Sequence, residues 1–227
     1  MCVGLDAAFA LVLSAAFILG FEHSFEADHI VAVSTIVTQG RGLVRSLVTG
    51  SLWGLGHTFT LLAAGMIVIM LRVRIPAVIS NDLDYAVGLM LIVLGVWAVV
   101  NVKRQRLHFH VHSHDGKLHA HLHSHKENLS HDHPHIPFSV GVVHGLAGSG
   151  ALVVLVMSTI GSVAEGLFFL AAFGGGLMIA MGIISAVLNL PISYGGRFEQ
   201  LLRFALQTGA GVLSLVLGTL VLTGLLT

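Results

Sequence analysis

The chain has 227 residues, of which 55% are hydrophobic and 10% are charged, and its mean hydropathy is +0.91. An ordinary soluble domain is about 25% charged, so this composition excludes one and predicts a polytopic membrane protein. The formal net charge of zero gives no indication of a nucleic-acid partner, and the single cysteine, Cys2, excludes an internal disulfide and a Cys-x-x-Cys metal site.

Apolar windows along the chain predict an all-α fold with six membrane-spanning helices. The start of the chain lacks a basic segment of the kind that opens a signal peptide, so we expect the first apolar stretch to stay in the mature protein. The expected helices cover about residues 7–36, 44–71, 84–102, 138–160, 164–189 and 203–226.

The first apolar stretch contains a cluster of ionisable side chains. Burying such groups in a bilayer costs several kcal/mol unless a partner compensates them, which indicates a functional site. Imidazole and carboxylate ligands together suit Ni, Co, Zn, Fe or Mn, and the alternative is a set of buried polar residues that join helices and bind nothing. The cluster comprises Glu22, His23, Glu26, Asp28 and His29.

The direction of these side chains depends on whether the helix is straight. On a straight helix Glu22, Glu26 and His29 share one stripe, with His23 at its edge and Asp28 pointing away. The stretch is too long for a simple span and carries Gly20 just before the cluster, so we expect a bend or an unwound turn there. A bend would let Asp28 turn toward the site.

The spacing His23-x-x-x-x-Asp28-His29 resembles the His-x4-Asp-His signature of the nickel/cobalt transporter family. The fuller signature, His-Ala-x-Asp-Ala-Asp-His, differs here at Ser24 and at Glu26, which keeps the charge of Asp on a longer side chain. The chain length is similar to that of the six-helix relatives, which include urease-associated nickel permeases and nickel/cobalt efflux proteins. The resemblance implies transport of Ni²⁺ or Co²⁺ through these residues.

A second element, Gly56-His57-Thr58, resembles the Gly-His-Ser element that the same family carries in a later helix. His57 lies in the middle of the second predicted span, and the small residues around it allow helices to approach closely. We therefore add His57 to the candidate metal ligands. The alternative is a neutral imidazole that is hydrogen-bonded to a neighbouring helix.

The two ends of the chain contain similar patterns. Gly20-x-x-His23 recurs as Gly141-x-x-His144, and the pair Gly88 and Gly95 recurs as Gly211 and Gly218. Three spans in each half would place the second copy upside down relative to the first, as in many secondary transporters. The predicted division is a first half at 1–102, a loop at 103–137 and a second half at 138–227, with His23 and His144 as partners near the midplane.

In the fifth predicted span, Gly174-Gly175-Gly176 either unwinds the helix or packs against a neighbouring one, and packing is favoured.

The loop 103–137 holds eleven of the fifteen histidines. Asp115-Gly116 is typical of a two-residue hairpin turn, which would pair the strands on either side. Period-two alternation would then place six histidines on one face, able to bind borderline metal ions such as Ni²⁺ or Zn²⁺. The alternative is a disordered histidine-rich buffer without fixed pairing. The expected pairs are His108 with His123, His110 with His121 and His112 with His119.

Nine of the eleven Lys and Arg residues fall in alternate loops on one side of the predicted spans. The positive-inside rule then places both termini outside and the loop 103–137 in the cytoplasm of a cell bounded by a plasma membrane.

The first functional hypothesis is a Ni²⁺ or Co²⁺ transporter whose histidine-rich loop collects metal. The alternatives are a zinc or iron carrier, or a membrane metal sensor or storage protein that does not transport. We do not expect an enzyme, because the chain has no His-Glu-x-x-His and no nucleophile motif. The expected partners are the divalent ion, the lipid bilayer, a cytoplasmic metallochaperone and a second copy of the chain, but no nucleic acid.

Overall fold

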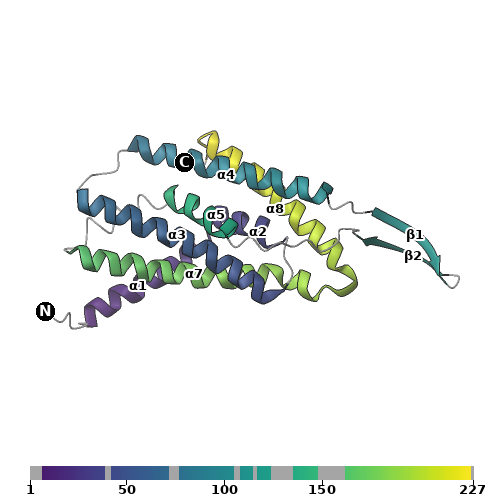
Figure 1. Cartoon of the computed structure of the whole chain (residues 1–227), viewed down its shortest axis with the longest axis horizontal. Helices are drawn as coiled ribbons and strands as arrows, with labels where there is room; N and C mark the ends of the chain where they lie inside the picture. The colour runs from purple at the N-terminus through teal and green to yellow at the C-terminus, as the bar shows by residue number, and fades with distance from the viewer. Residues whose placement is uncertain are drawn as a thin grey trace.

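The computed structural model describes residues 7–38, 42–71, 77–104, 108–114, 117–123, 135–147 and 162–225. Long helices lie side by side in a bundle, and a two-stranded hairpin projects from one end of it (Figure 1). The elements are α1 (Ala7–His23), α2 (Ala27–Val37), α3 (Leu43–Leu71), α4 (Ala77–Arg104), β1 (His108–His114), β2 (Lys117–His123), α5 (His135–Ala147), α7 (Val163–Tyr194), the short 3₁₀ helix η1 (Gly196–Phe198) and α8 (Glu199–Leu222).

The described helices are those of a membrane protein. Among the described residues, three segments are long and apolar enough to cross a bilayer: Tyr85–Val102 of α4, the whole of α7 and the whole of α8. The bent pair α1 and α2 adds a fourth if it counts as one span. Only the first part of the predicted span 138–160 is described, as α5, and its remainder lies outside the described residues.

The first predicted span is broken. α1 ends at His23, α2 begins at Ala27, and the two helices are bent by 63°. The prediction of one helix over 7–36 was therefore wrong, whereas the expected bend after Gly20 is confirmed. Glu26 explains the break locally, because its backbone is extended, with ψ of 143°, at the position that starts α2.

Hydrogen bonds hold the break in place. The Ser24 hydroxyl lies 3.1 Å from the carbonyl oxygen of Gly20 and 3.4 Å from that of Leu177 in α7. The backbone N–H of Glu26 donates to the carbonyl of His23 at 3.1 Å, which closes the turn. The break therefore has defined contacts on both sides and presents His23 and His29 on two differently directed helices.

Glycines let the helices cross at backbone distance. A Cβ atom on Gly20 of α1 would overlap the carbonyl oxygen of Phe173 in α7. A Cβ atom on Gly141 of α5 would likewise overlap the carbonyl oxygen of Trp53 in α3. Each of the two helices that carry a Gly-x-x-His pattern thus packs on a helix from the other end of the chain.

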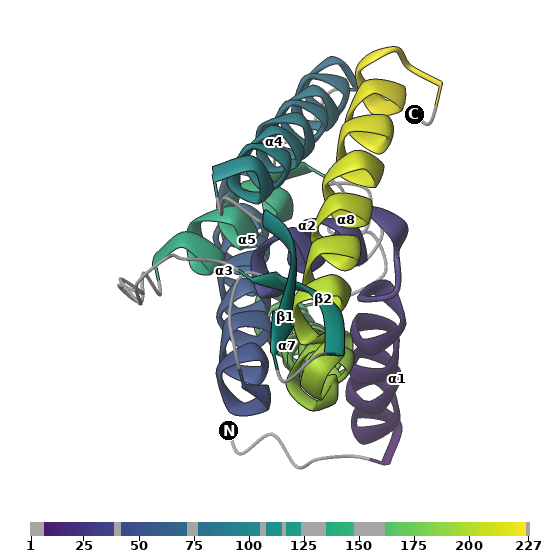
Figure 2. The ribbon, with the colours of Figure 1, turned by 90° about the vertical axis from the view of Figure 1, so that its right-hand side faces the viewer.

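α4 and α8 also pack through glycines, and they lie together along one side of the bundle (Figure 2). A Cβ atom on Gly95 would lie 2.7 Å from the carbonyl oxygen of Gly211, and one on Gly218 would lie 2.7 Å from that of Gly88. The four glycines of the predicted repeat therefore meet in two cross-pairs, Gly95 with Gly211 and Gly88 with Gly218.

Gly174, Gly175 and Gly176 lie inside α7, which is helical from Val163 to Tyr194. A Cβ atom on Gly174 would overlap the side chain of Thr58 in α3, and one on Gly176 would overlap the carbonyl oxygen of Phe17 in α1. The expected packing role is confirmed for these two glycines, and the helix does not unwind.

The hairpin has the predicted register. β1 and β2 are antiparallel, and their Cα partners include His108 with His123, His110 with His121 and His112 with His119. Asp115 and Gly116, the predicted turn, lie outside the described residues. The strands extend away from the bundle at the end of α4 (Figure 1).

Candidate metal centre

Four histidines from four helices meet where the first span breaks. His23 is the last residue of α1, His29 lies in the first turn of α2, His57 lies in the middle of α3, and His144 is close to the end of α5. His29, His57 and His144 are at most 1% exposed, and the side chain of His23 is 10% exposed. Such burial of four imidazoles requires a chemical reason, because each ring carries two polar nitrogens.

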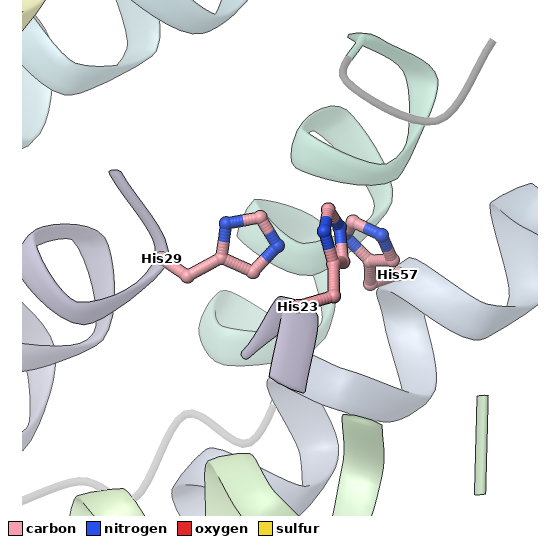
Figure 3. Close-up of side chains that lie close together, drawn as sticks. All are labelled: His23, His29 and His57. Atoms are coloured by element: carbon pink, nitrogen blue, oxygen red, sulfur yellow. The ribbon is translucent and has the colours of Figure 1, made fainter. Parts of the chain in front are cut away.

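Three of these rings face one another, as Figure 3 shows for His23, His29 and His57. One nitrogen from each lies within 4.8 Å of the other two. The ring centroids are 4.5 Å apart for His23 and His29, 5.3 Å for His29 and His57, and 5.6 Å for His23 and His57. Three nitrogens at this spacing form one face of a coordination site for a borderline metal ion.

Several nitrogens at this face have no protein partner. Among the described residues, the buried atoms without a hydrogen bond include Nε2 of His23, Nε2 of His29 and both ring nitrogens of His57. Leaving a buried polar atom unpaired costs about 1–3 kcal/mol. Coordination of a metal ion by these lone pairs would remove that cost. If the histidines only joined helices, these nitrogens would stay unpaired and the cost would remain.

In His23 and His29, the ring nitrogen that does not face the other imidazoles is hydrogen-bonded to a carboxylate. Oε1 of Glu26 lies 2.7 Å from Nδ1 of His23, and Oδ1 of Asp28 lies 2.9 Å from Nδ1 of His29. Because a carboxylate can only accept, each Nδ1 carries the hydrogen and each Nε2 keeps its lone pair. Carboxylates paired in this way orient metal-binding histidines and increase their basicity.

The two predicted carboxylate ligands differ in their surroundings. Glu26 hydrogen-bonds Nδ1 of His23 and belongs to neither group of potential ligands among the described residues, whereas Asp28 hydrogen-bonds Nδ1 of His29 and also belongs to such a group. Glu22 is exposed and belongs to neither candidate group among the described residues. The stripe of Glu22, Glu26 and His29 requires a straight helix, and the helix is broken between the first two of these residues.

Asp28 also connects the cluster to α5. Its Oδ2 atom lies 2.9 Å from Nε2 of His144, so that Asp28, His29 and His144 form a second group whose ligand atoms lie within 4.8 Å of one another. The bend in the first span brings Asp28 inward, as expected. His23 and His144, the predicted partners, lie on either side of His29, with ring centroids 4.5 Å and 4.4 Å from its own.

Trp53 completes the centre and was not singled out from the sequence. Its fully buried ring stacks on His57 with the centroids 5.5 Å apart, and it lies 5.1 Å from both His29 and His144. A tryptophan one helical turn before a buried histidine is the signal that could have indicated this contact. The indole limits how the imidazoles can rotate and keeps water from that side of the centre.

These features define a helical membrane protein with a candidate metal centre at its broken first span. The chain is 36% identical over 216 residues to urease accessory protein UreH of Bacillus sp. (strain TB-90), and the match covers 91% of this chain and 88% of that protein. The chain therefore belongs to the family of urease accessory protein UreH.

Two plant proteins are more distantly similar. The Arabidopsis thaliana chloroplast proteins FOR GROWTH AND FERTILITY 2 and 1 are 29% and 26% identical to the chain over 164 and 186 residues. These matches cover 68% and 76% of this chain, but only 40% and 48% of the plant proteins. No family model and no solved structure matches the chain.

Proposed function

We propose that the protein carries Ni²⁺ or Co²⁺ across the plasma membrane and binds the ion at His23, His29 and His57. The observation that carries this proposal is the set of buried imidazole nitrogens that face one another without protein partners. The resemblance of the first-span motif to nickel/cobalt transporters and the kinship with a urease accessory protein both support nickel as the cargo.

The ligand atoms support this class of ion. Three imidazole nitrogens suit borderline ions such as Ni²⁺, Co²⁺, Zn²⁺ and Fe²⁺, whereas Mg²⁺ and Ca²⁺ prefer oxygen. Asp28 and Glu26 add negative charge behind two of the rings, which compensates part of the charge of a divalent ion in an apolar environment. We propose transport rather than catalysis, because the first-span motif resembles that of nickel/cobalt transporters.

We further propose six spans arranged as two inverted halves, at 1–102 and 138–227, with both termini outside and the loop 103–137 in the cytoplasm. The cross-paired glycines of α4 and α8, and the packing of α1 on α7 and of α5 on α3, support this symmetry. The start of α1 and the end of α8 point away from the hairpin, which supports placing the termini and the loop on opposite sides (Figure 1).

Flux measurements in vesicles across a panel of Ni²⁺, Co²⁺, Zn²⁺, Fe²⁺ and Mn²⁺ test the proposal. We expect movement of Ni²⁺ or Co²⁺, and we expect it to persist in part when the histidine-rich loop is deleted. Preferential movement of Zn²⁺ or Fe²⁺ would support the alternative carriers. Tight binding of an ion without any flux would show a sensor or storage protein and would overturn the proposal.

Glu26 is expected to act through His23. Glu26→Ala should weaken binding of Ni²⁺ by about 10- to 100-fold, the usual effect of losing the carboxylate behind a metal-bound histidine. Glu26→Gln should be milder, because the amide oxygen can still accept the hydrogen bond from Nδ1 of His23. Titration of the purified variants with Ni²⁺ measures this, with Glu22→Ala as the control for a nearby exposed carboxylate. Equal affinity of wild type and Glu26→Ala would exclude this role.

For the loop we propose that six of the seven histidines of β1 and β2 collect metal ions in cross-strand pairs before or after transport. The seventh, His114, is paired with Lys117. Free imidazole has a pKa of about 6.5 and binds metal only when neutral. Loop binding should therefore be complete above that pH and be lost as the pH falls toward about 5. A disordered buffer would show the same pH dependence. A substitution in the turn is therefore needed to distinguish ordered cross-strand pairs from a disordered loop.

Replacing Asp115-Gly116 by Ala-Ala should weaken loop binding, because a two-residue turn of this kind needs residues with positive φ. The left-handed conformation costs alanine about 1–2 kcal/mol, which corresponds to about a 5- to 30-fold loss of affinity. Zn²⁺ titration of the full chain in a His29→Ala background, which removes the buried centre, measures the loop alone. Unchanged affinity and stoichiometry would favour the buffer without fixed pairing.

A further inference from the structure

His29 belongs to both groups of potential ligands. We propose that the transported ion occupies two successive positions that share His29: a first position at His23, His29 and His57, and a second position at Asp28, His29 and His144. This inference rests on the proposed transport function. Transfer of the ion from the first position to the second is the step that moves it from ligands of the first half of the chain to a ligand of the second half.

The geometry places His29 between the two positions. Its ring centroid is 4.5 Å from that of His23 and 4.4 Å from that of His144, so that the two histidines of the repeated Gly-x-x-His pattern lie at nearly the same distance from it. A neutral imidazole has one lone pair and binds one ion at a time. The two positions are therefore alternatives for one ion.

The two positions use opposite nitrogens of His29. Nε2 is buried, unpartnered and, as Figure 3 shows, directed toward His23 and His57, whereas Nδ1 faces Asp28. For the second position, Nδ1 of His29 and Nε2 of His144 each give a proton to water, and the opposite nitrogen of the same ring takes one up. Each ring carries one hydrogen before and after the transfer, so the transfer releases no net proton.

The two positions offer different ligand sets. The first position offers three nitrogens, and the second offers one carboxylate oxygen and two nitrogens. Each position also contains one partly accessible side chain, His23 at 10% and Asp28 at 32%, while the other three histidines are almost fully buried. Each position thus has its own contact with the surroundings, and His29 is the buried link between them.

Co²⁺ is a suitable probe, because its visible absorption depends on the number and type of its ligands. The experiment compares the full-length wild type, His57→Ala and His144→Ala in detergent. Co²⁺ bound by the loop is measured in His29→Ala, which lacks both positions, and is subtracted. His135→Ala, on the same helix as His144 but exposed and outside both groups, is the matched control.

We expect the wild type to bind one Co²⁺ at the centre. His144→Ala should keep one Co²⁺ with a three-nitrogen spectrum, and His57→Ala should keep one with a different spectrum from an oxygen ligand and two nitrogens. Both variants should lose flux in vesicles while His135→Ala retains it. If an alanine variant does not reach the membrane, His57→Gln or His144→Gln keeps the side-chain volume and makes the same comparison.

Two results would overturn the inference while leaving the transport proposal intact. One is an identical loss of affinity with the same spectrum in His57→Ala and His144→Ala, which would show a single composite site. The other is simultaneous binding of two Co²⁺ ions at the centre of the wild type. Failure of the proposed function would be seen separately, as wild-type vesicles that move no ion.

Discussion

His29→Ala is expected to abolish ion binding at the buried centre and transport at the same time. His29 contributes a nitrogen to both groups of potential ligands, and its Nδ1 atom is one of the contacts that orient Asp28. Loss of an orienting partner alone costs about 10- to 100-fold in metal affinity, so loss of the ligand itself should exceed that. Titration with Ni²⁺ of wild type and His29→Ala from which residues 108–123 have been deleted isolates the centre from the loop.

Thermal unfolding provides an independent measurement of the same change. Ni²⁺ at about 100 times its dissociation constant stabilises the folded wild type by about 2.7 kcal/mol, and this increment should disappear in His29→Ala. The control is again His135→Ala, which should keep the increment. A His29→Ala protein that is still stabilised by Ni²⁺ under these conditions would place the ion elsewhere in the molecule.

The second large effect is expected from Gly176→Ala in α7. The new methyl group would overlap the carbonyl oxygen of Phe17 and push α1 away from α7. Overpacking of this kind costs about 1–3 kcal/mol, and here the neighbour is backbone that cannot rotate aside. Since α1 ends at His23, the same displacement should also weaken ion binding.

Gly175→Ala is the matched control at the adjacent position. A Cβ atom on Gly175 meets nothing within 4 Å, so this substitution should leave stability unchanged or raise it by up to about 1 kcal/mol through helix propensity. Denaturation of the purified proteins in mixed detergent micelles compares the two. Equal stability of Gly175→Ala and Gly176→Ala would show that α1 and α7 do not pack at the distance described.

The sequence by itself determined the features that depend on local composition and spacing. The length of the apolar stretches identifies a membrane protein, and buried ionisable groups in such a stretch identify a site whatever the fold. The hairpin register also follows locally, because a two-residue turn and a period of two leave one way to pair His110 with His121. The bend in the first span was predictable from its excess length and from Gly20.

Only the tertiary structure decided which atoms face the ion. Whether Asp28 is a ligand or a partner of His29 depends on where α5 places His144, and that position is set by the crossing of Gly141 over the carbonyl of Trp53. The place of Trp53 in the centre follows from the same crossing. Contacts between residues so far apart in the chain arise from how closely two helices approach, and this distance depends on the residues of both helices rather than on any pattern within one of them.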